Sequence, residues 1–215
     1  MNWNDTQSIV TGACGFIGSH LTEALVRRGS KVRALALYDA RGTFGWLAEL
    51  APDIRTSVEI VAGDVRDAEQ MRRLILPNSQ VFHLAALIGI PYSYAAPRSY
   101  LETNLTGTLN VLEAARDLGA KRVFVTSTSE VYGSALRVPI DENHPLQAQS
   151  PYSASKIAAE KLAESYFRSF KTPVTVVRPF NTYGPRQSPR AVIPTILIQL
   201  LAGAPELVLG DVTTT

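Results

Sequence analysis

Three side chains in the second half of the chain have the types and spacing of a proton-transfer site. Tyr152 and Lys156 stand four residues apart in the only Tyr-x-x-x-Lys of the sequence, so a helix would carry both on one face. A nearby ammonium stabilises a phenolate and brings tyrosine toward use as a base. Glu130 follows the apolar run at residues 122–125, where a buried carboxylate is costly unless it has a partner or a task. These residues indicate acid–base chemistry.

The elements that must position these side chains follow from the pattern of apolar residues. We expect strands at residues 8–12, 32–37, 58–63, 80–86, 122–127, 174–180 and 206–210, and helices at 16–28, 44–50, 67–76, 98–118, 152–170 and 190–203. Several strands are apolar on both faces, as in a sheet covered by helices on both sides. Their alternation with helices through short connections predicts an α/β, doubly wound parallel sheet. Residues 133–151 form a long loop with three prolines, which we interpret as an active-site flap.

A glycine-rich turn joins the first expected strand to the first expected helix. Gly12, Gly15 and Gly18 form G-x-x-G-x-x-G in “TGACGFIG”. Glycines let the backbone approach a pyrophosphate, whose charge meets the N–H groups and the dipole of the following helix. In this strand–turn–helix setting the motif predicts a Rossmann-type domain that binds NAD or NADP. Cys14, inside the turn, is interpreted as a small filler and not as a reactive thiol.

Residues further along bear on which dinucleotide binds. Asp39 has roughly the offset from the turn at which a carboxylate usually binds the adenosine ribose hydroxyls of NAD. Arg33 and Arg41 lie nearby and would instead favour the 2′-phosphate of NADP, so NAD is the prediction and NADP stays open. Asp64, directly after the third strand, is expected to reach the adenine edge through its side chain or backbone. Asp67 is expected to cap the next helix.

Composition limits the remaining possibilities. The 215 residues are 46% apolar and 19% charged, with a net charge of +2, and no Lys/Arg cluster suggests a nucleic-acid partner. A single cysteine fits a reducing compartment. The N-terminus has no basic segment followed by an apolar one, and no apolar run reaches the length of a membrane span. We therefore expect a cytoplasmic protein with no membrane partner, and we assign no metal ligands.

A series of motifs runs through nearly the whole chain. It comprises “VTGACGFIG”, “GDVRD”, “FHLAA”, “TNLTGTLNVLEAA”, “TSTSEVYG”, “YSASK” and “RPFNTYGPRQ”. In these motifs the chain resembles the extended short-chain dehydrogenase/reductase family, the NAD-dependent epimerase/dehydratases of nucleotide sugars. Within that family, “AALIGIPYSY” and “RPFNTYGPRQSPRAVIPTIL” are similar to the UDP-N-acetylglucosamine 4,6-dehydratases of the legionaminic-acid type. The implied substrate is a UDP-N-acetylhexosamine.

The resemblance implies a role for each catalytic side chain. Tyr152 would remove the proton of the sugar 4-hydroxyl while hydride leaves C4 for NAD, and Lys156 would support Tyr152 and hold the nicotinamide ribose. Thr128, with Ser127 as its rival, would hydrogen-bond the 4-oxygen. Once C4 is a ketone, Glu130 would take the acidified C5 proton, water would leave from C6, and the hydride would return there. A 4-epimerase needs no such acid, so the implied reaction is a 4,6-dehydration.

One position departs from the dehydratase pattern. Many hexose 4,6-dehydratases have Thr-Asp-Glu where this chain has Thr128, Ser129 and Glu130, so Glu130 or a water would have to assist the departing hydroxyl. Nucleotide-glucuronate decarboxylases also carry Ser before Glu. Decarboxylation and 4-epimerisation therefore stay open as alternatives. A truncated NAD-binding module without activity is the alternative outside enzymes.

The resemblance also implies binding residues, an assembly and an extent. The implied cofactor-binding residues are Gly12, Gly15, Phe16, Ile17, Gly18, Asp39, Asp64, Val65, Leu84, Ala85, Ala86, Asn104, Tyr152 and Lys156. The implied residues for a nucleotide-diphosphate sugar are Ser127, Thr128, Ser129, Asn181 and Arg186. Helices 98–118 and 152–170 would pair into a homodimer. We expect residues 1–215 to hold the NAD(P)-binding domain and, from about 181, only the start of a substrate-binding lobe that is largely missing from this chain.

Overall fold

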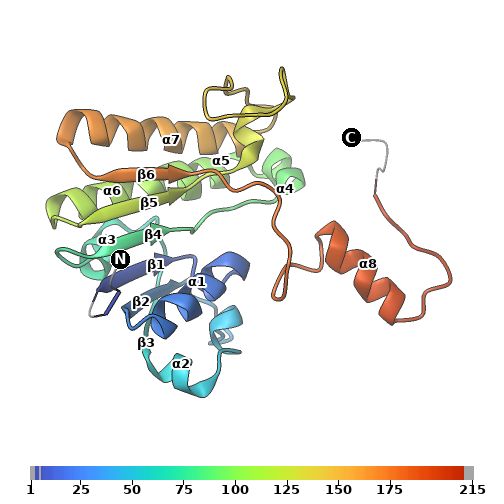
Figure 1. The fold of residues 1–215 in the computed structure, drawn as a ribbon, viewed down its shortest axis with the longest axis horizontal. Helices are drawn as coiled ribbons and strands as arrows, with labels where there is room; N and C mark the ends of the chain where they lie inside the picture. Colours follow the sequence, from blue (N-terminus) through green and yellow to red (C-terminus); the bar gives the residue numbers. More distant parts are fainter. Residues whose placement is uncertain (1–2, 5, 211–215) are drawn as a thin grey trace. The chain divides into compact units, whose positions relative to one another are not determined.

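The computed structural model describes residues 3–4 and 6–210 and divides into two compact units, Met1–Phe180 and Asn181–Thr215. The larger unit holds a six-stranded sheet in which neighbouring strands are parallel (Figure 1). The strands are β1 (Gln7–Thr11), β2 (Lys31–Ala36), β3 (Val58–Ala62), β4 (Gln80–His83), β5 (Arg122–Thr126) and β6 (Val174–Val177), in the order β3-β2-β1-β4-β5-β6. The predicted Rossmann-type sheet is confirmed. Its strand order reverses between β1 and β4, where such sheets bind ligands.

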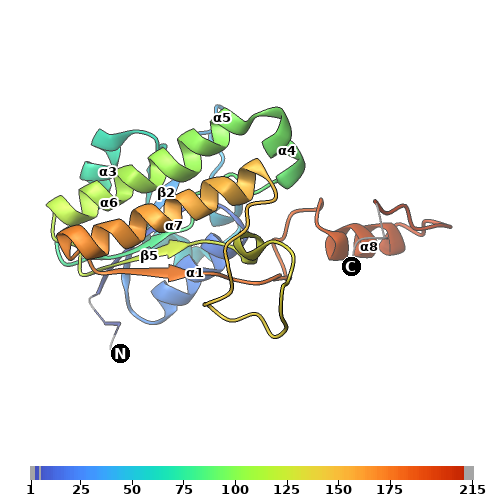
Figure 2. The same cartoon turned by 90° about the horizontal axis from the view of Figure 1, so that it is seen from above.

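Helices cover both faces of this sheet. The helices α1 (Phe16–Arg27) and α2 (Pro52–Thr56) pack on one face, and α3 (Ala68–Leu74), α6 (Gly107–Asp117) and α7 (Pro151–Phe170) pack on the other. Successive residues of β1 point to opposite faces, so Ile9 joins the core under α3, α6 and α7 while Val10 joins the core under α1 and α2. Figure 2 shows α6 and α7 side by side. Within the described residues, no helix is long and apolar enough to cross a bilayer.

The helix predicted at 98–118 has an irregular beginning. It consists of α5 (Pro97–Tyr100), a π-helical segment at Leu101–Thr106 and then α6. Single wide turns of this kind are frequent at functional sites. This one carries Asn104, which is 1% exposed, and turns it toward the segment that follows β4.

Several boundaries differ from the prediction. The strand β4 ends at His83 and not at residue 86, so residues 84–86 lie beyond the sheet. The predicted helix 44–50 is only a 3-10 turn at Gly45–Leu47, because Gly45 has a positive φ angle that an α-helix does not accommodate. The short helices α2 and α4 (Ile90–Ala95) begin beside prolines and are too short for an apolar periodicity to predict.

The smaller unit contains α8 (Val192–Leu201), which confirms the helix predicted at 190–203. The strand predicted at 206–210 is wrong. The backbone of Val208 instead exchanges two hydrogen bonds with the Gln199 side chain, at 2.9 and 2.7 Å. An apolar run becomes a strand only beside another strand, and the described part of this unit contains none. Residues 211–215 of the predicted substrate lobe lie outside the described residues.

The glycine turn gives a first testable prediction. A Cβ on Gly18 would lie 2.1 Å from the carbonyl oxygen of Gly12, whereas a Cβ on Gly15 would lie 3.4 Å from the same oxygen. We expect Gly18→Ala to lower the free energy of unfolding by about 1–3 kcal/mol, as overpacking does. The matched variant Gly15→Ala should cost clearly less. Urea unfolding of both variants is the measurement, and equal losses would contradict the close approach of Gly18 to Gly12.

Candidate active site

The candidate site lies at the C-terminal edge of the sheet, where β1, β4 and β5 end side by side. Thr11 is in register with His83, and His83 with Val125, so the segments after the three strands begin at one level. A Cβ on Gly12 would lie 2.7 Å from the backbone nitrogen of Ala85. The structure therefore brings the glycine turn against segment 84–86, and both were predicted to bind the dinucleotide.

The start of α1 fits a phosphate group. Its N-cap residue, Gly15, gives no side-chain hydrogen bond, and its first turn, which begins with Phe16 and Ile17, holds no acidic residue. A Cβ on Gly15 would have only the oxygen of Gly12 within 4 Å. The space at this helix terminus is thus open, and the first helical amides and the dipole attract an anion there.

The polar residues around β2 bear on which arginine could bind the 2′-phosphate of NADP. Asp39 accepts hydrogen bonds from the Thr43 hydroxyl at 2.5 Å and from the Arg41 amide at 3.0 Å, and these bonds lower the pKa of its carboxyl. Arg33 donates to the two backbone carbonyls that end α3, at 2.9 and 3.1 Å. Arg33 is therefore not available to a 2′-phosphate, and of the two arginines considered only the exposed Arg41 remains.

The segment after β3 is fixed by α6. Asn110 donates to the carbonyls of Val65 and Arg66, both at 2.9 Å, and Val65 is 4% exposed. The guanidinium of Arg66 donates to the Asp64 carboxylate at 2.6 and 2.9 Å and lowers its pKa. The Asp64 amide donates to Gln70 Oε1 at 2.7 Å and its carbonyl accepts from the Asp67 amide at 3.1 Å, so the expected contact of Asp64 with an adenine edge stays a prediction. Asp67 caps α3 by accepting from the Gln70 amide at 3.0 Å, as predicted.

A one-directional chain of hydrogen bonds passes through His83. Thr108 donates its hydroxyl proton to the Asn104 carbonyl at 2.6 Å, so it must accept from His83 Nε2–H at 3.0 Å. His83 Nδ1 then accepts from the Thr11 hydroxyl at 2.8 Å, and Thr11 accepts from the Ala85 amide at 3.2 Å. Neutral His83 thereby joins the end of β1, the segment after β4 and the π-helical turn.

This placement of His83 predicts an acid-sensitive contribution to stability. Burial, and secondly the charge of Lys156, lower the pKa of His83 from 6.5 to about 3. Between these two pH values the unfolded chain binds the proton and the folded protein does not, so stability falls as pH falls through that window. We expect a loss of about 1.4 kcal/mol per pH unit below pH 6 from this residue. In His83→Gln the slope of unfolding free energy against pH should be smaller, and an unchanged slope would contradict a neutral buried His83.

Asn104 joins the segment after β4 to α7. Its Oδ1 accepts from the Leu87 amide at 2.8 Å, and its Nδ2 donates to the Leu87 carbonyl and to Ser155 Oγ, both at 2.9 Å. The Ser155 hydroxyl donates to the Tyr152 carbonyl at 2.7 Å. The buried amide of Asn104 therefore ties the backbone of Leu87 to the beginning of α7.

Lys156 is buried behind the end of β5. It is 6% exposed, and its Nζ donates to the Thr126 carbonyl at 2.6 Å. Burial lowers the pKa of Lys156 from 10.5 to about 8, while the charge of Glu160 acts to raise it. The ammonium form thus prevails at neutral pH, with one N–H held by the sheet and further N–H groups to donate.

Tyr152 lies one helical turn before Lys156 and is 6% exposed. Its ring packs edge-on against Tyr100, with ring centroids 6.2 Å apart, and the Tyr100 hydroxyl donates to the Gly89 carbonyl at 2.5 Å. Burial raises the pKa of the Tyr152 phenol, and a hydrogen bond with Thr128 acts in the opposite direction. Thr128 and Tyr152 are therefore neighbours, as the predicted site requires.

Glu130 corrects one premise of the sequence interpretation. It does not lie in a buried strand but in the 3-10 turn Ser129–Tyr132, where its side chain is exposed, so burial does not explain its presence. The Thr128 hydroxyl caps this turn by accepting from the Glu130 amide at 3.2 Å. The carboxylate forms no ion pair with any of the described residues, and its charge raises the pKa of Tyr152. The Glu130 side chain is therefore within electrostatic reach of the Tyr152 phenol.

The other predicted substrate residues differ in how far the structure describes them. The Ser127 hydroxyl is buried and has no partner within the described residues, which keeps it as the rival of Thr128. Ser129 is held by its amide, which donates to the Pro179 carbonyl at 3.1 Å. Asn181 and Arg186 belong to the smaller unit, where Asn181 is exposed and Arg186 has a φ of 70°. Their role with a diphosphate stays a prediction.

Comparisons with known proteins identify the family of this chain. A family model described as GDP-mannose 4,6 dehydratase matches residues 9–215. The chain belongs to the NAD-dependent epimerase/dehydratase family. The chain is 37% identical over 207 residues to the dTDP-glucose 4,6-dehydratase of Streptomyces antibioticus, with 94% of the chain and 61% of that enzyme covered. It is 36% identical over 187 residues to UDP-glucuronate 4-epimerase 2 of Arabidopsis thaliana, covering 85% of the chain and 43% of that enzyme.

Solved structures give the same result. The dTDP-glucose 4,6-dehydratase of Streptomyces venezuelae, crystallised with NAD, superposes with a TM-score of 0.82 at 36% identity over 92% of this chain and 63% of that one. The UDP-N-acetylglucosamine 4-epimerase of Methanobrevibacter ruminantium M1 superposes with a TM-score of 0.87 at 32% identity over 97% of this chain and 66% of that one. The chain thus spans about three fifths of the length of these two dehydratases. Dehydratases and epimerases are both similar to it.

Four residues around the site were not predicted. Tyr100 and Ser155 support Tyr152 and Asn104, and no spacing rule distinguishes them from ordinary helix residues. Glu160 and Arg178 form a buried ion pair at 2.7 Å. The sequence does carry a signal for Glu160, because it stands four residues after Lys156 within the small apolar residues of “KIAAEKLA”.

Proposed function

We propose that this protein is an NAD-dependent nucleotide-sugar 4,6-dehydratase that acts on a UDP-N-acetylhexosamine. The observation that carries the proposal is the place of Thr128, which accepts from the Glu130 amide at 3.2 Å and hydrogen-bonds the Tyr152 phenol, so that a carboxylate and a phenol lie on either side of it. A 4-epimerisation needs only one proton-transfer group. The similarity of residues 85–94 and 178–197 to the legionaminic-acid type of dehydratase supports the choice of sugar.

The side chains divide the reaction between them. Tyr152, with Lys156 beside it, accepts the proton of the 4-hydroxyl as C4 is oxidised, and Thr128 donates a hydrogen bond to the 4-oxygen. The C4 ketone acidifies the C5 proton, and the Glu130 carboxylate accepts it. The C6 hydroxyl then leaves as water with the proton that Glu130 carries, a hydride enters at C6, C5 takes a proton from solvent, and Tyr152 releases the 4-hydroxyl proton to solvent. The sum of these steps is the loss of one water and a 4-keto-6-deoxy sugar.

The residues that would hold NAD are those that the structure gathers at the sheet edge. The open start of α1 receives the pyrophosphate, segment 84–86 lies along the dinucleotide, and Lys156 donates to the nicotinamide ribose. When bound, NAD supplies the acceptor for the C4 hydride and its donor to C6. Asp39 favours NAD, since a carboxylate at the adenosine ribose repels the 2′-phosphate of NADP.

Two alternatives have specific support. The similarity to UDP-glucuronate 4-epimerases and to a UDP-N-acetylglucosamine 4-epimerase favours simple C4 inversion. Ser129, in place of a second acid, favours decarboxylation of a nucleotide glucuronate, because a carboxylate at 129 would repel the C6 carboxylate of that substrate. Neither alternative includes an elimination, so in neither does Glu130 remove the C5 proton.

A product assay in D₂O separates these reactions. The protein with NAD is incubated with UDP-N-acetylglucosamine, dTDP-glucose, UDP-glucuronate or UDP-galactose, and the products are identified by NMR and mass spectrometry. We expect a 4-keto-6-deoxy sugar with deuterium at C5 from UDP-N-acetylglucosamine. Carbon dioxide release, or C4 inversion without solvent label, would overturn the proposal in favour of the corresponding alternative.

A homodimer is part of the proposal. The helices α6 and α7 lie side by side on one face of the sheet, and Phe167 and Phe170 of α7 are 55% and 52% exposed. Exposed aromatic side chains on neighbouring helices suit a two-fold helix pairing. Light scattering after size-exclusion chromatography at micromolar concentration should give twice the mass of one chain. A monomer under these conditions would contradict the pairing.

A further inference from the structure

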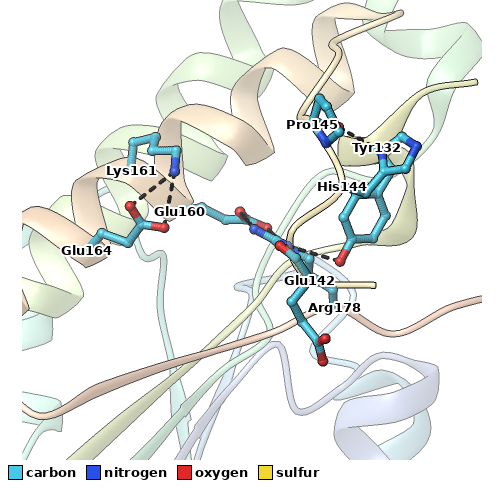
Figure 3. A network of polar contacts seen from close by, with 8 residues as sticks. All are labelled: Tyr132, Glu142, His144, Pro145, Glu160, Lys161, Glu164 and Arg178. Atoms are coloured by element: carbon cyan, nitrogen blue, oxygen red, sulfur yellow. Dashed lines mark hydrogen bonds and ion pairs between the residues drawn. The ribbon is translucent and has the colours of Figure 1, made fainter. Parts of the chain in front are cut away.

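A polar network joins the turn of Glu130 to the helix of Tyr152 and Lys156. At its centre, the Arg178 guanidinium donates from Nε and Nη2 to the two carboxylate oxygens of Glu160, at 2.9 and 2.7 Å (Figure 3). The side chain of Glu160 is 0% exposed and that of Arg178 is 16% exposed. Removing one partner of such a pair leaves an uncompensated buried charge, whereas an apolar pair of similar size is often tolerated.

The third nitrogen of the Arg178 guanidinium binds the turn that carries Glu130. Its Nη1 donates to the Tyr132 hydroxyl at 3.0 Å, and its guanidinium carbon lies 5.0 Å from the centroid of the Tyr132 ring. Tyr132 is 3% exposed and ends the 3-10 turn that Thr128 caps. Lysine has no planar fork that could serve two carboxylate oxygens and a hydroxyl at once, so this geometry requires arginine.

The loop predicted as a flap at 133–151 ends at residue 150, where α7 follows, and it is organised around the same tyrosine. The ring of His144 packs edge-on against Tyr132 with centroids 5.6 Å apart, and His144 Nε2 accepts from the Leu136 amide at 3.0 Å. The Gln147 amide donates to the Val131 carbonyl at 2.8 Å. Both ends of the loop are thus fastened to the turn that Arg178 holds.

We infer that Arg178 is a positioning residue, which fixes the turn carrying Glu130, and with it loop 133–150, relative to the helix that carries Tyr152 and Lys156. Its functional consequence rests on the proposed 4,6-dehydration, in which Glu130 and Tyr152 act in turn on neighbouring carbons of one sugar. The influence of the Glu160 charge on Lys156, four residues earlier on α7, places the network beside the catalytic end of that helix.

Hydrogen–deuterium exchange tests the positioning without any need for activity. In the double variant Glu160→Met/Arg178→Met the buried charges leave together, so the fold should persist. We expect amides of residues 129–149 to exchange about tenfold faster or more, with those of β1 and β4 unchanged, because the turn loses its tie to α7. Tyr132→Phe should give a smaller increase in the same segment.

The chain offers a matched control. Lys161 and Glu164 form an exposed ion pair at 3.1 Å on the same helix, and Lys161→Met/Glu164→Met should leave exchange in residues 129–149 unchanged (Figure 3). Wild-type exchange in this segment of the Glu160→Met/Arg178→Met protein would overturn the inference. So would acceleration that spreads equally over the sheet, because that indicates a purely structural pair.

A second measurement tests the functional consequence. In Tyr132→Phe we expect exchange of the substrate C5 proton with solvent to slow about tenfold while C4 oxidation keeps its rate, since a displaced base loses rate steeply with distance. Equal slowing of both steps would contradict positioning of Glu130. A different result would contradict the proposed function itself, namely an unchanged rate of C5 proton exchange in Glu130→Gln.

Discussion

Replacing Glu130 by glutamine is expected to stop the elimination and to leave the first oxidation intact. Glutamine keeps the size of the side chain and the amide that donates to Thr128, but it cannot accept the C5 proton. A positioned general base contributes about 10²–10⁴-fold, and we expect loss of that size in formation of the 4-keto-6-deoxy product. Because Tyr152 and Lys156 are untouched, addition of substrate should accumulate the reduced cofactor, which is followed by its absorbance.

The control for this variant is Glu142→Gln. Glu142 is an exposed glutamate of the loop 133–150, and its carboxylate is not among the groups that shift the pKa of Tyr152. It should turn over like the wild-type protein. Full turnover by the Glu130→Gln protein would show that Glu130 is not the base, and 4-epimerisation would then be the favoured reaction.

Replacing Tyr152 by phenylalanine is expected to block the reaction one step earlier. The ring keeps its edge-on contact with Tyr100, so NAD affinity and fold should be retained. Without the phenol no group accepts the 4-hydroxyl proton, and we expect C4 oxidation to fall by about 10²–10⁴-fold. Neither the reduced cofactor nor deuterium at C5 should then appear.

Tyr166→Phe is the matched control for this effect. Tyr166 is also buried at 6% exposure and lies on the same helix, 14 residues after Tyr152, which is roughly 21 Å along α7. Loss of the Tyr166 hydroxyl should leave the single-turnover rate of C4 oxidation unchanged. A Tyr152→Phe protein that oxidises C4 at the wild-type rate would show that another group is the base.

The sequence predicts the scaffold well because its signals are local. Each of these signals lies within a short stretch of sequence: the glycines of the first turn, the apolar strands and the Tyr152–Lys156 spacing. The structure forms the sheet from these strands and places the glycine turn and Lys156 at its C-terminal edge. The strand expected at 206–210 does not form, because strand formation also depends on residues that are distant in the sequence. An apolar run depends on a partner strand, and Val208 finds the Gln199 side chain in place of one.

The details of the site depend on contacts that sequence spacing does not contain. Glu130 follows a buried strand by only four residues, yet a 3-10 turn carries its side chain into solvent. Arg33 is close to Asp39 in sequence, but the carbonyls at the end of α3 bind it. The pairing of Glu160 with Arg178 joins residues 18 positions apart from a helix and a strand end, which only the tertiary fold brings together.

The pKa of Tyr152 is the most direct test of whether Glu130 and the phenol share one site. It can be followed by ¹³C NMR of tyrosine Cζ, with the signal assigned by its absence in Tyr152→Phe. A nearby negative charge disfavours the phenolate, so the pKa of Tyr152 should be lower in Glu130→Gln than in the wild-type protein and unchanged in Glu142→Gln. If Tyr152 titrates at the same pH in Glu130→Gln and in the wild-type protein, the two groups do not act on one sugar, and the 4,6-dehydratase proposal is contradicted.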